Sequence, residues 1–237
     1  MLKNFKMSTN NLEKILFLDI ETAPLVYHYN ELTDTAKELW DKKWLYNKEQ
    51  SPELQYQKAG IYAEFAKVIC IGLGYYNAGK FRIKCISGEN EKEVLLQFVE
   101  LLKTHFNSPS HQLCAHNGKE FDFPFLCRRA LINGIALPEA LKIQGKKPWE
   151  INHIDTMEMW KFGDYKNYTS LDLLAHVFGI PSPKDVMDGS KVAKVFYEEK
   201  GLDKIAAYCK KDVITLARVF NRFSGASGPE EKDIIYT

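Results

Sequence analysis

The sequence has no long hydrophobic run and no apolar run within its first 14 residues. Its longest apolar stretch, VICIGLGYY at residues 68–76, is well short of the ~20 residues that a membrane-spanning helix needs. The first residues, MLKNFKMSTNNLEK, are polar and lack the apolar core of a signal peptide. We therefore expect a soluble cytoplasmic protein with no membrane partner, and a flexible tail at residues 1–13.

An excess of charge of one sign is also absent. The net charge is +1, which excludes a uniformly basic nucleic-acid coat and an acidic tail protein but allows a local basic groove. The five cysteines are irregularly spaced and form no C-x-x-C pair, so we expect free thiols in a reducing compartment. Cys114 and His116 offer half of a zinc site, but no second half follows and we expect no structural zinc.

Strand and helix patterns alternate along a chain of 237 residues, a length that suits one domain. Residues 15–20 are almost wholly apolar, which predicts a strand buried on both faces, and the NAG turn between residues 67–76 and 80–88 predicts a hairpin. Residues 90–106 have helical spacing, with Asn90 as N-cap. The other predicted strands are residues 111–117 and 151–157, and the other predicted helices are residues 123–133, 170–178, 190–199 and 201–223. This order predicts an α/β fold with a mixed central sheet flanked by helices.

Two segments depart from the alternation. Residues 30–65 are rich in Glu, Lys, Leu, Trp and Tyr and contain no glycine before Gly60, so we expect a mostly helical insertion between the first two strands. The closing residues, 224–237, are interpreted as a second flexible tail. The predicted domain therefore spans residues 14–223, with the insertion at about 30–65.

Two acidic residues stand close together on the first predicted strand. Because side chains alternate along a strand, Asp19 and Glu21 of LDIET point to the same face. Two carboxylates ~4 Å apart repel by roughly 4 kcal/mol at an effective dielectric of ~20, and a divalent cation between them would offset this. An exposed strand edge, with both acids in water, would explain the same pair.

Two further segments offer polar groups at the ends of predicted elements. AHNGKEFDFPFL places Asn117 and Asp122 where a strand gives way to a helix, and Asp122 alone would serve as an N-cap. Tyr208 and Asp212 are four residues apart and share one face of the last long helix. A core tyrosine beside a solvated acid is the simpler interpretation when this segment is taken alone.

Other acidic residues compete for the same role. Tyr168 and Asp172 repeat the Y-x3-D spacing, but Asp172 stands at the start of a predicted helix in a pattern like a capping box, and we interpret it as a cap. Asp155 ends a predicted strand and is either a further acid beside the site or a helix cap. Asp185 and Asp188 lie among prolines and glycine and are interpreted as turn residues.

Taken in order, the three segments resemble the motifs of the DEDD 3′–5′ exonuclease superfamily: D-x-E on the first strand, N-x3-4-F-D after a strand, and Y-x3-D on the last long helix. The likeness covers about residues 14–223. It is stronger still to stand-alone bacterial proteins similar to the exonuclease domain of family B DNA polymerases, in which segments like SLDLLAHVFGIPSPK, DGSKV and IAAYCKKDVITLARVF recur. The resemblance implies an RNase H-like fold and, because Tyr208 stands where another branch has histidine, the tyrosine type.

The resemblance also implies a mechanism, the hydrolysis of terminal phosphodiesters at the 3′ ends of single-stranded nucleic acid, with DNA expected. Two Mg²⁺ or Mn²⁺ ions would take part. Asp19 would bridge both ions, Glu21 and Asp212 would complete the site of the ion that activates water, and Asp122 would hold the second.

The remaining implied site residues are Tyr208, which would orient the attacking water, and Asn117, which would contact the substrate or fix its loop. Two alternatives stay open. An RNA-trimming exonuclease would carry the same motifs, because contacts to the 2′-hydroxyl lie outside them. A non-catalytic nucleic-acid-binding module would be expected to lack at least one of the metal-binding carboxylates, whereas all four are present. No polymerase segment accompanies the motifs, so we expect no proofreading in cis, and the sequence leaves protein partners unknown.

Overall fold

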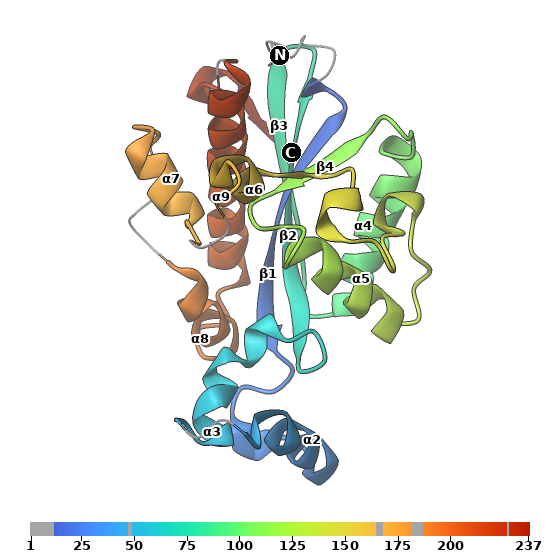
Figure 1. The fold of residues 1–237 in the computed structure, drawn as a ribbon, viewed down its shortest axis with the longest axis vertical. Coiled ribbons are helices and arrows are strands. Elements are labelled where there is room, and N and C mark those ends of the chain that lie inside the picture. The colour runs from blue at the N-terminus through green and yellow to red at the C-terminus, as the bar shows by residue number, and fades with distance from the viewer. Residues whose placement is uncertain (1–11, 47–48, 165–167, 182–186, 227) are drawn as a thin grey trace.

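A mixed six-stranded sheet forms the centre of the fold (Figure 1). The computed structural model describes residues 12–46, 49–164, 168–181, 187–226 and 228–237. The strands are β1 (Ile15–Pro24), β2 (Ala66–Asn77), β3 (Lys80–Ser87), β4 (Gln112–Ala115), β5 (Ile154–Asp155) and β6 (Ile234–Tyr236). They lie in the order β5-β4-β1-β2-β3-β6, with β1 antiparallel to β2 and parallel to β4. The predicted hairpin is the antiparallel pair β2 and β3.

Helices cover both faces of the sheet, which explains why β1 is apolar on both sides (Figure 1). On one face lies α9 (Leu202–Ser224), with α7 (Leu171–Val177) and α8 (Val192–Tyr197) beside it; on the other lie α4 (Glu91–His105) and α5 (Asp122–Ile132). Helix α4 begins as predicted, because the Asn90 side chain accepts a hydrogen bond from the Lys92 N–H at 3.2 Å.

A buried ion pair joins α4 to α5 and to the sheet. Glu91 accepts hydrogen bonds from Arg129 Nε at 2.8 Å and Arg129 Nη2 at 2.5 Å, and from the backbone N–H of Val68 at 2.7 Å. Arg129 also donates to the carbonyl oxygen of Ala63 at 2.8 Å. The pair satisfies its own polar groups, which is the condition under which a buried charge is tolerated.

Two glycines on β2 allow α9 to approach the sheet closely. A Cβ atom on Gly72 would lie 2.8 Å from Cys209 Sγ, and one on Gly74 would lie 2.8 Å from Val213 Cγ1, both too short for real contacts. The absence of side chains here therefore sets the depth at which α9 packs, and with it the position of Tyr208 relative to β1.

The segment between β1 and β2 forms a small aromatic core of its own, at the end of the sheet where α2 and α3 appear in Figure 1. Its helices are η1 (Tyr29–Glu31), α2 (Asp34–Trp44), α3 (Pro52–Gln55) and η2 (Tyr56–Ile61). Trp40 is fully buried at its centre and donates from Nε1 to the carbonyl oxygen of Pro52 at 2.8 Å. Thr22 Oγ1 donates to the carbonyl oxygen of Gly60 at 2.7 Å, which ties the insertion to β1.

The strand predicted at residues 151–157 is much shorter in the structure. Only Ile154–Asp155 pairs with β4, because Asp155 already acts as the N-cap of α6 (Thr156–Lys161). The remaining short 3-10 helices are η3 (Glu139–Leu141), η4 (Pro148–Glu150), η5 (Gly189–Lys191) and η6 (Glu231–Asp233).

The C-terminal residues correct the prediction of a flexible tail at 224–237. Strand β6 pairs in parallel with β3, the Thr237 N–H donates to the carbonyl oxygen of Ile83 at 2.9 Å, and Lys80 forms an ion pair with Asp233 at 2.6 Å. A strand of three residues has too little pattern to be recognised before its partner is known. Most of the predicted N-terminal tail, residues 1–11, lies outside the described part of the chain, while Leu12 is buried in the core.

Within the described residues, none of the helices has the length and apolar character that a bilayer crossing requires. All five cysteines are free thiols.

Candidate active site

A cavity of about 660 Å³ opens beside the second half of β1 and contains every predicted site residue. They come from three parts of the fold: β1, the loop and helix that follow β4, and α9. The predicted residues on its wall are Asp19, Glu21, Asn117, Asp122, Tyr208 and Asp212. The tertiary structure thus brings together groups that are far apart in the chain.

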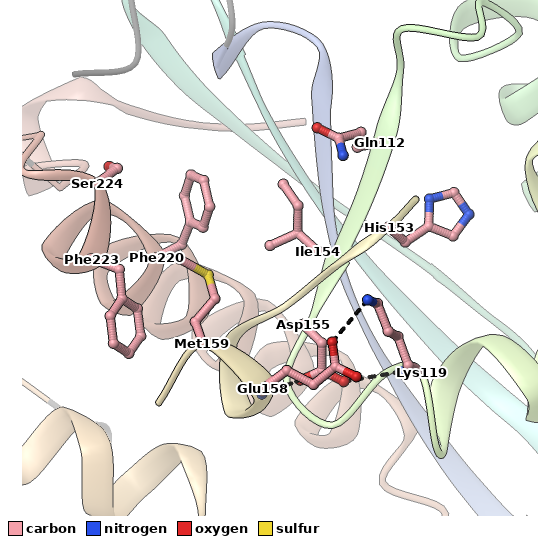
Figure 2. A pocket seen from close by; sticks show the side chains of 10 residues that line it. All are labelled: Gln112, Lys119, His153, Ile154, Asp155, Glu158, Met159, Phe220, Phe223 and Ser224. Carbon is pink, nitrogen blue, oxygen red and sulfur yellow. Dashed lines mark hydrogen bonds and ion pairs between the residues drawn. The ribbon is translucent and has the colours of Figure 1, made fainter. Parts of the chain in front are cut away.

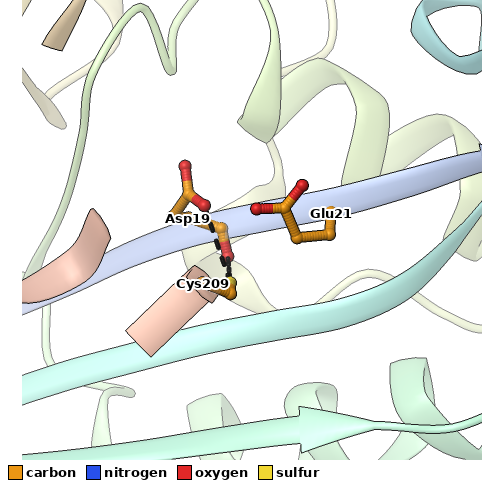
Figure 3. A group of neighbouring side chains, drawn as sticks. All are labelled: Asp19, Glu21 and Cys209. Atoms are coloured by element: carbon orange, nitrogen blue, oxygen red, sulfur yellow. Dashed lines mark hydrogen bonds between the residues drawn. The ribbon is translucent and has the colours of Figure 1, made fainter. Parts of the chain in front are cut away.

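The two acids of β1 lie next to each other, as their spacing predicts (Figure 3). Ligand atoms of Asp19, Glu21 and Cys209 all lie within 4.8 Å of one another. Glu21 is only 6% exposed, so the alternative in which both acids face water is wrong. Burial is the largest cause that raises the pKa of each carboxyl well above its ordinary value, and the negative charge of Asp212 raises both further.

Asp122 is the first residue of α5 and is 3% exposed. The N-cap of this helix is Phe121, without a side-chain cap, so the interpretation of Asp122 as a cap is also wrong. Burial raises the pKa of Asp122 to about 7, and the nearby charge of Asp155 adds to this. Burying this carboxyl in its charged form is therefore costly. Asp122 also lines the cavity.

Tyr208 and Asp212 share the face of α9 that lines the cavity. The Tyr208 hydroxyl lies close enough to the Asp212 carboxyl for each group to shift the pKa of the other. Burial raises the pKa of Asp212 to about 7. Burial and the neighbouring acids also raise the pKa of Tyr208 well above its ordinary value, so the phenol keeps its proton.

Asn117 follows β4 in a left-handed backbone conformation, with φ of 60°. Asp155 holds this loop, because its carboxylate accepts hydrogen bonds from the N–H of Asn117 at 3.0 Å and of Lys119 at 3.1 Å while it caps α6. Of the two alternatives for Asp155, the structure therefore supports the cap. The Oδ1 atom of Asn117 is buried and has no hydrogen-bond partner among the described residues, which leaves it available to a ligand.

The interpretation of Asp172 as a helix cap is wrong. The N-cap of α7 is Ser170, whose Oγ accepts from the Leu173 N–H at 3.2 Å, whereas Asp172 lines the cavity. Its charge, added to burial, raises the pKa of Asp212. The repeated Y-x3-D spacing was the only signal for this residue in the sequence. Asp188 accepts from the Ser190 N–H at 3.0 Å at the start of η5, as a turn residue would, and Asp185 lies outside the described residues.

A second cavity, of about 570 Å³, lies between α6 and α9 and is lined by apolar side chains such as Met159 and Phe220 (Figure 2). Its two acids already have partners: Asp155 accepts from the Lys119 N–H, and Glu158 forms an ion pair with Lys119 Nζ at 2.8 Å. Because Lys119 also lines it, the second cavity does not gather carboxylates without a lysine or arginine, as the described lining of the first cavity does.

A family model described as a predicted 3′–5′ exonuclease related to the exonuclease domain of PolB matches residues 61–233. The chain belongs to this family. The match includes Asp122, Tyr208 and Asp212 but begins after β1, so Asp19 and Glu21 lie outside it. The predicted relationship to the exonuclease domain of family B polymerases is confirmed.

Two proteins that this chain is similar to are DNA polymerases. A DNA polymerase from Pyrococcus glycovorans is 23% identical over 139 residues, which is 52% of this chain and 17% of the polymerase. The structure of the family B DNA polymerase from the hyperthermophilic archaeon Pyrobaculum calidifontis aligns with a TM-score of 0.52 at 16% identity, over 88% of this chain and 24% of the polymerase. The chain thus spans only a small part of either polymerase. At this identity the likeness shows the fold, and the predicted α/β, RNase H-like fold is confirmed.

Proposed function

We propose that this protein is a metal-dependent 3′–5′ exonuclease that removes nucleotides one at a time from the 3′ ends of single-stranded DNA. The observation that carries the proposal is that acidic side chains gather in the cavity without a lysine or arginine among its described lining residues. Four predicted ligands, Asp19, Glu21, Asp122 and Asp212, line it. Carboxylates gathered without a cation are the arrangement that divalent metal sites use.

The donor set fits hard ions such as Mg²⁺ or Mn²⁺, because all four groups offer carboxylate oxygens. Asp19 would be shared by two ions, with Glu21 and Asp212 completing one site and Asp122 the other. Such ions, when bound, lower the pKa of a coordinated water and neutralise the charge that develops on the phosphate and the leaving oxygen. Cys209, close to Asp19, offers a soft sulfur donor that these ions disfavour.

Tyr208 is suited to hold the attacking water in place. Its raised pKa keeps the hydroxyl protonated near neutral pH, so it orients the water by hydrogen bonding and does not act as a general base. In the reaction the water oxygen forms a bond to phosphorus, the bond from phosphorus to the 3′-oxygen breaks, and that oxygen takes a proton. The products are a nucleoside 5′-monophosphate and a strand shorter by one nucleotide.

The rim of the cavity is suited to an unpaired strand end. Ile61 of the insertion is 55% exposed and Tyr168 is 68% exposed, and both line the cavity together with Phe121. Aromatic side chains can stack on bases in a manner that tolerates any sequence, and an exposed apolar side chain can pack beside them. The unsatisfied Oδ1 atom of Asn117 would accept a hydrogen bond from the terminal nucleotide. Similarity to two DNA polymerases favours DNA over RNA.

The test is degradation of a 5′-labelled single-stranded DNA and of its RNA counterpart, with Mn²⁺ or Mg²⁺ and with EDTA. We expect a ladder that shortens from the 3′ end of the DNA, disappears in EDTA and is absent for Asp19→Asn. Asp203→Asn, which changes an exposed acid of α9, is the matched control and should stay active. Faster trimming of RNA would favour the RNA-specific alternative. No cleavage of either strand by the folded protein would favour the non-catalytic binding module.

A further inference from the structure

Three of the five cysteines meet directly behind the carboxylate site, although they come from β2, β3 and α9. Cys70 lies opposite Ser87 in the β2–β3 ladder and Cys85 lies opposite Gly72, which makes the two cysteines diagonal neighbours on one face of the sheet. Their Sγ atoms are 2.7 Å apart. Cys209 Sγ occupies the space above Gly72, and its thiol interacts with those of Cys70 and Cys85.

The distance between Cys70 Sγ and Cys85 Sγ distinguishes a disulfide-forming pair from a metal site. Two thiolates bound to one zinc ion at ~2.3 Å in tetrahedral geometry would be about 3.8 Å apart. A disulfide bond is about 2.05 Å long, so the 2.7 Å separation is closer to a disulfide than to joint metal ligation.

The two thiols also differ in exposure and in pKa, and disulfide exchange needs one accessible thiol that is deprotonated. Cys70 is fully buried, while Cys85 is partly exposed and can be reached from solvent. Hydrogen bonds with Cys209, and then with Cys70, lower the pKa of the Cys85 thiol to about 4, and the charge of Lys210 contributes. A thiolate is the reactive form of cysteine, so Cys85 is placed to react first and Cys70 to resolve the product.

We propose that Cys70 and Cys85 form a redox-active pair that closes to an intramolecular disulfide when the protein meets a small-molecule disulfide of the glutathione class. Cys85 sulfur attacks one sulfur of the oxidant and forms a mixed disulfide, and one thiol is released. Cys70 sulfur then attacks Cys85 Sγ, and the second thiol leaves. The protein loses two electrons and two protons, and the oxidant is reduced to two thiols.

The pair is coupled to the carboxylate site through its neighbours. Cys70 lies opposite Glu21 in the β1–β2 ladder, and Cys209 Sγ is 3.5 Å from both the backbone oxygen and Oδ2 of Asp19 (Figure 3). A disulfide removes two thiols that interact with Cys209, so we expect the contact between Cys209 and Asp19 to change as well. This consequence rests on the proposed function: oxidation is expected to weaken divalent-ion binding and to lower nuclease activity.

The test counts thiols and so does not depend on activity. The reduced full-length protein is equilibrated with glutathione disulfide, denatured, labelled with a maleimide and analysed by peptide mapping. We expect two of the five thiols to be lost and a peptide link between Cys70 and Cys85. Cys85→Ser and, as a second variant that keeps a small buried side chain, Cys70→Ala should form no such link, while Cys127→Ser should behave as the wild type.

Five free thiols after equilibration, or a glutathione adduct on Cys85 that Cys70 does not displace, would overturn the proposal. Coupling is measured as a loss of nuclease activity on oxidation that dithiothreitol reverses in the wild type and that is absent from Cys85→Ser. Formation of the disulfide with unchanged activity would overturn the coupling alone. If the reduced protein cleaves nothing, the proposed function fails while the thiol count still decides the redox pair.

Discussion

Replacing Asp19 with asparagine should make the metal-free protein more stable, although the same change should abolish activity. Asparagine has nearly the same size and shape as aspartate, so no cavity is created. The change removes a negative charge whose ligand oxygen lies within 4.8 Å of that of Glu21. At this separation and an effective dielectric of ~20, the repulsion between the two carboxylates is roughly 3 kcal/mol.

Burial raises the pKa of Asp19, so protonation relieves part of this repulsion. For a chain of this size, each kcal/mol changes the melting temperature by about 2–4 °C. We therefore expect Asp19→Asn to melt up to roughly 10 °C above the wild type in EDTA at mildly alkaline pH. With Mn²⁺ or Mg²⁺ the wild type should gain about 2.7 kcal/mol at an ion concentration of 100 Kd, and the variant should gain little.

The assay is thermal unfolding followed by circular dichroism, in EDTA and in each metal. Asp203→Asn, which changes an exposed acid on the same long helix as Asp212, is the control and should behave as the wild type in both conditions. If Asp19→Asn melts at or below the wild type in EDTA, the carboxylates do not repel as the structure indicates. Equal stabilisation of variant and wild type by metal would remove Asp19 from the metal site.

Four further results are expected. Burial raises the folded-state pKa values of Asp122 and Asp212 from 3.8 to about 7, so their stabilising contribution is complete below pH 3.8 and is lost as the pH rises to about 7. The melting temperature of the wild type in EDTA, measured relative to that of Asp122→Asn, should fall across this window, and a rise would contradict the reasoning. Glu91→Ala leaves a buried guanidinium unpaired and should cost about 3–5 kcal/mol in urea unfolding. Tyr208→Phe should lower kcat by roughly 10²-fold with little change in KM, because only the orientation of water is lost. Asp155→Ala should destabilise the protein by ~1–2 kcal/mol, because α6 loses its N-cap. It should also raise KM for single-stranded DNA, because the loop after β4 loses the carboxylate that accepts its N–H hydrogen bonds. An unchanged KM would show that the loop does not bind substrate.

Several elements of the fold could be predicted because their patterns are local. The apolar run of β1, the NAG turn between β2 and β3, and the N-cap Asn90 all depend on neighbouring residues. Strand β6 could not be predicted, because three residues become a strand only through pairing with β3. The choice of Ser170 as N-cap, in place of Asp172, depended on where α7 begins, and such boundaries are the least certain part of a pattern.

For the site, the sequence by itself determined which residues have the chemistry. The period of a strand places Asp19 and Glu21 on one face, and the period of a helix places Tyr208 and Asp212 on another. Only the tertiary structure decided that these faces meet in one cavity, because Asp19 and Cys209, 190 residues apart, come into contact only where Gly72 lets α9 approach the sheet. The meeting of Cys70 with Cys85 likewise follows from the register of β2 on β3, which no local pattern encodes. Periodicity acts over a few residues, whereas register and helix packing are set by the whole core.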